Sequence, residues 1–289
     1  MIEALWLVLR AAGFVLTFQA AGTALFVAAF ARELGEHAPL AQRLGRRAAF
    51  AALALLALQL LGEPLHLAGE WAAVSGATLR ALEGSSASLA LVVCAVGLGW
   101  LALALRPAGG PLTPRVRLLA ALGAALAVGS QLLTGHTVGH PGRAFSGALL
   151  FMHLAIVAFW FGSLGLLHQL TLRAQPADAA RLIGAFSAAA VWLVPLIALA
   201  GAGMALVLLP GVAALRQPYG QLLLIKAALF ALLMGLAARN RLRLLPALAR
   251  ATARAPARLA RSIALEYALL VVVFIVTAVM TGEFSPQGD

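Results

Sequence analysis

Eight long stretches of apolar residues, separated by short connectors, constrain the fold of this chain more than any other feature. Most of them are close to the ~20 residues that an α-helix needs to cross the hydrocarbon core of a bilayer. Apolar residues run through them continuously instead of alternating with polar ones, which favours membrane helices over the strands of a porin-type barrel. The expected spans cover residues 3–30, 47–68, 86–105, 115–133, 145–170, 183–209, 217–238 and 262–281.

The composition excludes the main alternative classes of protein. Of the 289 residues, 63% are apolar and 11% are charged, whereas a soluble domain has roughly 45–50% apolar and about 25% charged residues. A soluble enzyme, a disordered chain and a coiled coil are therefore excluded. We predict an all-α fold, a polytopic transmembrane bundle of about eight spans that forms a single domain over residues 1–289 in the lipid bilayer.

Basic residues are divided unequally between the two sides of the predicted bundle. Sixteen arginines fall in the connectors of one side and three in those of the other, while Arg10 and Lys226 lie inside spans. Because cytoplasmic loops collect arginine and lysine, both termini are expected to be periplasmic. The net charge of +11 thus indicates orientation. Nucleic acid is not an expected partner, since basic patches interleaved with aromatic residues are missing from the sequence.

Prolines and glycines mark the connectors between the expected spans. Pro39, Pro176 and Pro256 are among them. Each is expected to lie between two helices, because proline breaks the interior of a helix. The spans that follow are therefore expected to begin after these prolines.

Histidine and methionine side chains concentrate toward the side of the bundle that carries the termini. Neutral imidazole binds copper, zinc, iron and nickel, and the thioether of methionine selects Cu(I). A copper site at the periplasmic side is therefore predicted. The alternative is that the histidines only make helix ends amphipathic and that the methionines fill apolar space. The predicted metal ligands are His66, His136, His140, His153, Met152 and Met280.

Ionisable side chains inside the spans are costly and are therefore functional candidates. Those expected to support the site are Arg10, Glu63, Lys226 and Glu266. The first two are expected to pair with one another or with the lysine, which is the single lysine of the chain. The lysine can act as a counter-charge or extend its ammonium to the interface. Glu266 lies in the opposite half and can pair with Arg239 or Arg241.

Sequence motifs for catalysis are missing. The chain contains no P-loop, dinucleotide-binding fingerprint, nucleophile elbow or HExxH motif. Its single cysteine, Cys94, excludes an intramolecular disulfide and any CxxC motif. We therefore do not expect an enzyme.

Several different short motifs lie in the second half of the chain. They are Thr134-Gly135-His136, His153 followed by the stretch 158–164, Phe186-Ser187, Tyr219-Gly220, Leu224-Ile225-Lys226, Arg239-Asn240-Arg241 and Glu266. As a set they resemble the CopD/PcoD family of copper-resistance membrane proteins, and the similarity is strongest over residues 130–282.

The resemblance implies a multi-pass protein of the bacterial inner membrane with eight helices. It implies that copper, as Cu(I) or Cu(II), binds at the periplasmic side and is imported or delivered. A periplasmic copper-binding protein of the CopC type is the implied partner. The sequence has no methionine-rich stretch, so a single intramembrane copper site is expected.

Two other functions remain open from the sequence. A b-type cytochrome or a quinone-linked redox protein would use two of His66, His136 and His153 to ligate haem b, since histidine is a common axial ligand of haem iron. A structural or assembly partner would have no site of its own. A Soret band in the absorption spectrum would identify the haem protein.

Overall fold

The computed structural model describes residues 2–70, 73–107, 112–134, 142–209 and 211–284. Within these ranges the chain is helical almost throughout and contains no β-strand. Eight helices are long and apolar enough to cross a membrane, so the expected all-α bundle of eight spans is confirmed. Such helices satisfy their backbone hydrogen bonds internally, which is the requirement that a bilayer places on an apolar chain.

Each span contains one long helix, and short helical segments follow or connect the long ones. The long helices are α1 (Ile2–Ala29), α3 (Ala38–Ala68), α5 (Ser86–Ala104), α6 (Pro114–Gly129), α7 (Arg143–Arg173), α8 (Pro176–Leu208), α9 (Pro218–Arg239) and α11 (Ala255–Glu283). The short segments are α2 (Ala31–Leu34), η1 (Gly35–His37), α4 (Gly76–Glu83), η3 (Ser130–Leu133), η4 (Val212–Arg216), the π-helical turn η5 (Asn240–Leu244) and α10 (Leu245–Ala249).

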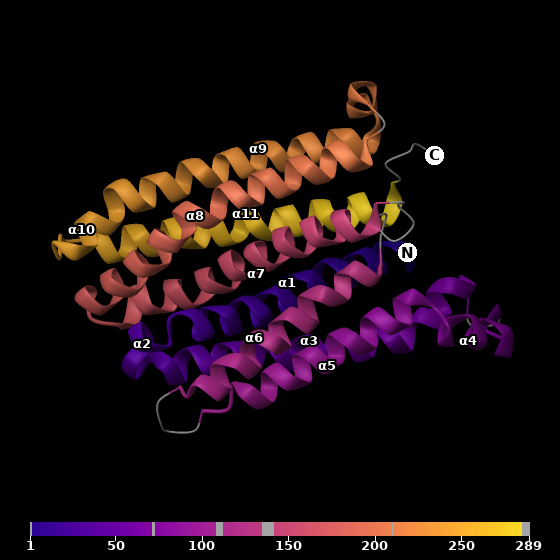
Figure 1. The fold of residues 1–289 in the computed structure, drawn as a ribbon, viewed down its shortest axis with the longest axis horizontal. Coiled ribbons are helices and arrows are strands. Elements are labelled where there is room, and N and C mark those ends of the chain that lie inside the picture. The colour runs from indigo at the N-terminus through magenta and orange to yellow at the C-terminus, as the bar shows by residue number, and fades with distance from the viewer. Residues whose placement is uncertain (1, 71–72, 108–111, 135–141, 210, 285–289) are drawn as a thin grey trace.

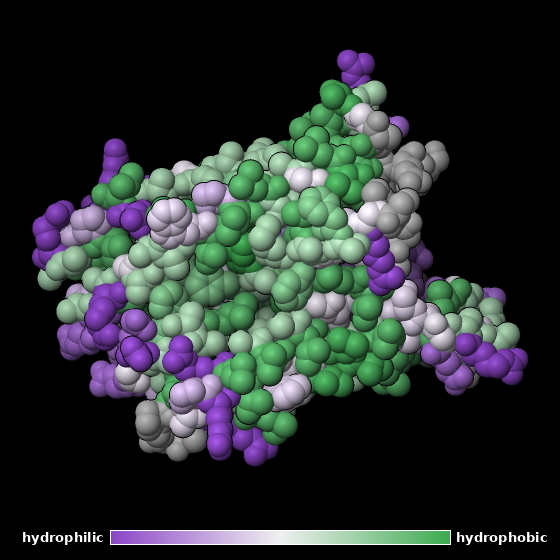
Figure 2. All heavy atoms as spheres, viewed as in Figure 1, coloured by the Kyte–Doolittle hydropathy of each residue, from purple (hydrophilic) through white to green (hydrophobic). Residues whose placement is uncertain are grey.

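The helices lie side by side and run between two ends of different chemistry (Figure 1). Ile2 and Phe284 lie at one end, which we call the terminal end. The other end, formed by α2, α10 and the first turns of α8 and α11, we call the arginine-rich end. Figure 2 shows hydrophilic residues gathered at the arginine-rich end and a broad hydrophobic surface between the two ends. That surface suits the hydrocarbon core of a bilayer.

Helix α1 forms the centre of the bundle and packs against α3, α6, α7 and α11. At its crossing with α7, Gly22 meets Gly162 so closely that a Cβ atom on Gly22 would lie 1.7 Å from the carbonyl oxygen of Ala158. Gln19 Nε2 and Thr23 Oγ1 donate to the carbonyl oxygen of Gly162, at 3.0 and 3.1 Å. Small residues and interhelical hydrogen bonds of this kind hold membrane helices together, because lipid removes most of the hydrophobic drive.

Pro39, Pro176 and Pro256 do not lie between helices, so this expectation is wrong. They stand in the first turns of α3, α8 and α11. Proline is favoured at this position, since the first turn leaves its N–H groups unpaired in any case and the fixed φ of proline suits a helix. The three helices therefore begin about two turns earlier than expected, and they extend beyond the apolar stretch at the arginine-rich end.

Candidate functional site

His66 lies in the last two turns of α3, at the terminal end, and is held by the first turns of α1. Its ring stacks on the indole of Trp6, with 4.4 Å between ring centroids and 12° between ring planes. Its Nδ1 atom lies 4.0 Å from Oε1 of Glu3 and is buried without a hydrogen-bond partner. A buried unpaired nitrogen of this kind is available to a ligand.

His153 lies in the half of α7 nearer the terminal end and faces α8. Its Nδ1 atom is 3.2 Å from the carbonyl oxygen of Ile197, and its ring lies against Gly201, where a Cβ atom would come within 3.4 Å of Cε1. Because a carbonyl oxygen only accepts, Nδ1 carries the proton and Nε2 is left with its lone pair. Metal-binding histidines are commonly oriented by this second hydrogen bond.

Lys226 lies in α9 and interacts electrostatically with His153. No salt bridge or hydrogen bond of this lysine occurs within the part of the chain that the structure describes. An ammonium group without a counter-ion beside a metal-ligand candidate opposes the binding of a metal cation.

Arg10 of α1 and Glu63 of α3 also lie in the half nearer the terminal end. They interact electrostatically with one another, although no nitrogen–oxygen pair between them comes within 4.0 Å among the described residues. The guanidinium of Arg10 lies against α11, because a Cβ atom on Gly282 would be 3.1 Å from Nη1. Glu283 adds a second carboxylate to the field around Arg10.

Two of the predicted copper ligands contact different helices of the bundle. His66 contacts α1, whereas His153 contacts α8. Met152 is partly buried against the core and Met280 is buried in α11. His136 and His140 lie outside the described residues. The six-residue site therefore stays a prediction.

A different group of potential metal ligands lies at the arginine-rich end, where no metal site was expected from the sequence. Glu36, His37 and Asp178 place one ligand atom each within 4.8 Å of one another. Asp178 already forms a salt bridge of 3.0 Å with Arg181, which competes with a metal ion. Asp178 lies far from Glu36 along the chain, which explains why the sequence pattern did not indicate this group.

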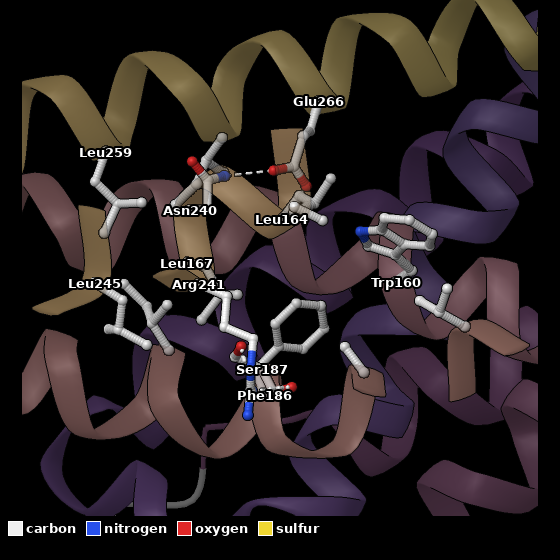
Figure 3. A pocket seen from close by; sticks show the side chains of 15 residues that line it. Trp160, Leu164, Leu167, Phe186, Ser187, Asn240, Arg241, Leu245, Leu259 and Glu266 are labelled. Carbon is white, nitrogen blue, oxygen red and sulfur yellow. Dashed lines mark hydrogen bonds between the residues drawn. The ribbon is translucent and has the colours of Figure 1, made fainter. Parts of the chain in front are cut away.

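A pocket in the arginine-rich half of the bundle, lined mainly by apolar residues, contains Glu266 (Figure 3). The carboxyl group accepts a hydrogen bond from Nδ2 of Asn240 and another from the indole of Trp160. The pocket is a cavity of about 60 Å³ lined by residues of α7, α8, α9, η5, α10 and α11. On α8 and α9 most of the lining residues lie in the half nearer the arginine-rich end.

The expected pairing of Glu266 with Arg239 or Arg241 is not what the structure contains. Asn240 occupies the buried position instead, and both arginines are exposed. Consecutive residues of a helix point about 100° apart, so only one of the three can face Glu266. Burying the neutral amide costs less than burying a guanidinium. Arg241 Nη1 donates to the carbonyl oxygen and the hydroxyl of Ser187, both at 2.9 Å.

Asn240, Trp160 and Ser187 belong to the quoted motifs, but the sequence pattern did not indicate that they line a pocket. The signal for Asn240 was an amide directly after an otherwise apolar helix, and in the structure it is the first residue of the π-helical turn. Turns of this kind are frequent at functional sites, but the sequence pattern does not reveal them.

Residues 180–280 match the family model of copper resistance protein D, CopD. The match contains most of α8, all of α9 and nearly all of α11, and with them Lys226, Asn240 and Glu266. No curated protein and no solved structure matches the chain. The resemblance to the CopD copper-resistance family that the motifs indicate is therefore confirmed across residues 180–280.

Proposed function

We propose that the protein binds copper at its terminal end and imports or delivers it, acting as a carrier and not as an enzyme. The observation that carries this proposal is the match of residues 180–280 to copper resistance protein D. Eight candidate spans support a location within a membrane. The location proposed is the bacterial inner membrane.

The distribution of arginines supports a direction for the proposed transport. Cytoplasmic loops of membrane proteins carry the excess of basic residues, so we place the arginine-rich end in the cytoplasm. The terminal end then faces the periplasm, where a copper-binding protein of the CopC type would deliver the ion. His66 and His153 both lie toward this end.

His153 is the best-supported copper ligand of the predicted set. Its ring is fixed by the Ile197 carbonyl, and Nε2 keeps its lone pair. Imidazole nitrogen binds both Cu(I) and Cu(II), and a thioether ligand would favour Cu(I). The residues that complete the site are predicted to come from His66, His136, His140, Met152 and Met280.

Copper binding by variants of the purified protein in lipid nanodiscs tests this proposal. His153→Ala is expected to lower copper affinity at least tenfold, because it removes a ligand. His168→Ala is the matched control, since Nδ1 of His168 is also held by a carbonyl, that of Ala260 at 3.0 Å, but in the arginine-rich half. Equal affinities of the two variants would contradict a site at His153.

The same preparation decides between copper handling and haem binding. We expect bound copper and no Soret band in the absorption spectrum. A Soret band that disappears in His153→Ala would instead identify a b-type haem protein. The absence of both metal and haem would favour a structural or assembly role.

A further inference from the structure

Glu266 is a carboxylic acid buried in the bundle with only neutral groups as hydrogen-bond partners. It is 3% exposed, and its partners are the amide of Asn240 and the indole of Trp160. No lysine, arginine or histidine nitrogen comes within 4.0 Å of it among the residues that the structure describes. The carboxyl group thus has no counter-ion.

The basic groups on the helices that pack against α11 do not contact Glu266. From α1, Arg10 lies against Gly282. From α7, His168 contacts the carbonyl of Ala260. The other ionisable side chains on these elements also lie away from Glu266 or are exposed. Lys226 lies near His153, which contacts the Ile197 carbonyl, and Arg241 donates to Ser187. Tyr219 lies in the first turn of α9, and the exposed ones are Glu3, Arg143, Arg173, Arg239 and Arg243.

An uncompensated charge at this position is costly. Removing a carboxylate from water without a cation costs several kcal/mol in a protein within a bilayer, whereas the protonated acid is neutral. Asn240 can form a hydrogen bond with Glu266 in either protonation state, because its N–H donates to a carboxylate and its Oδ1 accepts from a carboxylic O–H. That Oδ1 atom is buried and has no hydrogen-bond partner.

The cavity beside Glu266 offers a route for a proton. Its volume of about 60 Å³ exceeds the ~10–15 Å³ that one water molecule requires. Glu266, Asn240 and Ser187 line it, together with Arg241, which is exposed. Arg241 therefore marks the place where the cavity approaches the surface of the arginine-rich half.

We propose that Glu266 and this cavity form a proton-binding site that exchanges with water from the arginine-rich end. The carboxylic O–H bond breaks, its electron pair stays on the carboxylate, and a water molecule in the cavity takes the proton to become hydronium. The reverse step restores the acid. If the protein moves copper, which rests on the proposed function, this proton provides a step that can be coupled to that movement.

Infrared spectra of the copper-free protein in nanodiscs test the site. At neutral pH we expect the carbonyl stretch of a protonated carboxylic acid, shifted in D₂O and lost in Glu266→Gln. Glu83→Gln, which changes an exposed carboxylate in α4, is expected to keep the band. Asn240→Leu is expected to shift the band upward, because it removes the hydrogen bond to the carboxyl group.

Three outcomes would overturn the proposal. The first is a wild-type spectrum without this band, and the second is a band that survives in Glu266→Gln. If that variant does not fold, Glu266→Asp serves instead, and an unshifted band then counts against the proposal. The third is loss of the band when sodium replaces choline in the buffer, because the site would then hold a metal cation. Since copper is absent throughout, the result is independent of whether the protein handles copper.

Discussion

His153 and His168 are held in the same way at two depths of α7. Each directs Nδ1 at a backbone carbonyl of a neighbouring helix, Ile197 of α8 at 3.2 Å and Ala260 of α11 at 3.0 Å. This contact fixes the ring and leaves Nε2 free in both. The two histidines differ in their charged surroundings, because Lys226 lies near His153. If copper binds at His153 as proposed, its affinity is expected to depend on the charge of this lysine.

Replacing Lys226 with an apolar residue is expected to strengthen copper binding. At an effective dielectric constant of about 20, two unit charges ~8–16 Å apart interact by about 1–2 kcal/mol. Lys226→Met should therefore raise copper affinity roughly five- to thirtyfold, measured by competition with a chelator. Lys226→Arg keeps the charge and is expected to leave the affinity within a factor of about three. Weaker binding by the methionine variant would show instead that the lysine supports the site.

The sequence indicated that Glu266 lies inside a span but assigned it the wrong partner. A lone carboxylate in an apolar helix is visible in any sequence, and pairing it with arginine is the usual solution. Asn240 lies 26 residues away from Glu266, and only the packing of α9 against α11 decides which side chain faces it. The position of the residue was thus predictable, whereas its contact was not.

At the scale of elements, the crossing of α1 and α7 is the tightest contact of the bundle. Gly22 and Gly162 bring the two backbones together, since a Cβ atom on Gly162 would lie 2.5 Å from the backbone nitrogen of Thr23. Such proximity allows the side-chain hydrogen bonds from α1 to reach a backbone carbonyl of α7. The crossing fixes α7 and, with it, the depth and direction of His153.

Gly22→Ala is expected to destabilise the protein. The new methyl group would overlap the Ala158 carbonyl, so the helices must separate, and overpacking of this kind costs about 1–3 kcal/mol or more. Thermal unfolding in nanodiscs should show a lower midpoint. Gly184→Ala in α8 is the control, because nothing lies within 4 Å of its Cβ position and alanine is the better helix former. Equal loss of stability in both variants would contradict the role of the crossing.

The three prolines were expected to mark connectors, whereas they lie in the first turns of helices. Proline excludes the interior of a helix but is favoured in its first turn, and the sequence does not distinguish the two cases when polar residues follow. The eight spans were predicted correctly because their apolar stretches are long. The starts of α3, α8 and α11 at the arginine-rich side were not, because charged residues continue these helices beyond the apolar core.

At the scale of the whole molecule, the two ends of the bundle differ in charge, and the hydrophobic surface lies between them (Figure 2). The start of α1 and the end of α11 lie at the same end of the bundle, opposite to the arginine-rich segments (Figure 1). The preference of basic loops for the cytoplasm supports the proposed orientation, with the arginine-rich end on that side. It also places His153 in the half from which periplasmic copper would arrive.

Labelling of single cysteines in intact cells tests this orientation. In a Cys94→Ser background, Ala213→Cys in η4 at the terminal end is expected to react with a membrane-impermeant thiol reagent. Thr252→Cys at the arginine-rich end is expected to react only after the cells are permeabilised. Both positions are exposed, so a difference in labelling reports the side of the membrane and not burial within the protein. The opposite labelling pattern would reverse the proposed direction of transport.

The sequence by itself determined the class of fold, the number of spans and the half of the bundle in which His66, His153, Lys226 and Glu266 lie. These properties follow from hydropathy and helical rise, which are local, because a bilayer forces an apolar chain into helices. Tertiary structure decided which helices are neighbours, and hence that Ile197 orients His153, that Asn240 meets Glu266 and that a cavity lies beside Glu266. Those contacts join residues far apart in the chain, and they depend on how side chains of different helices fit together.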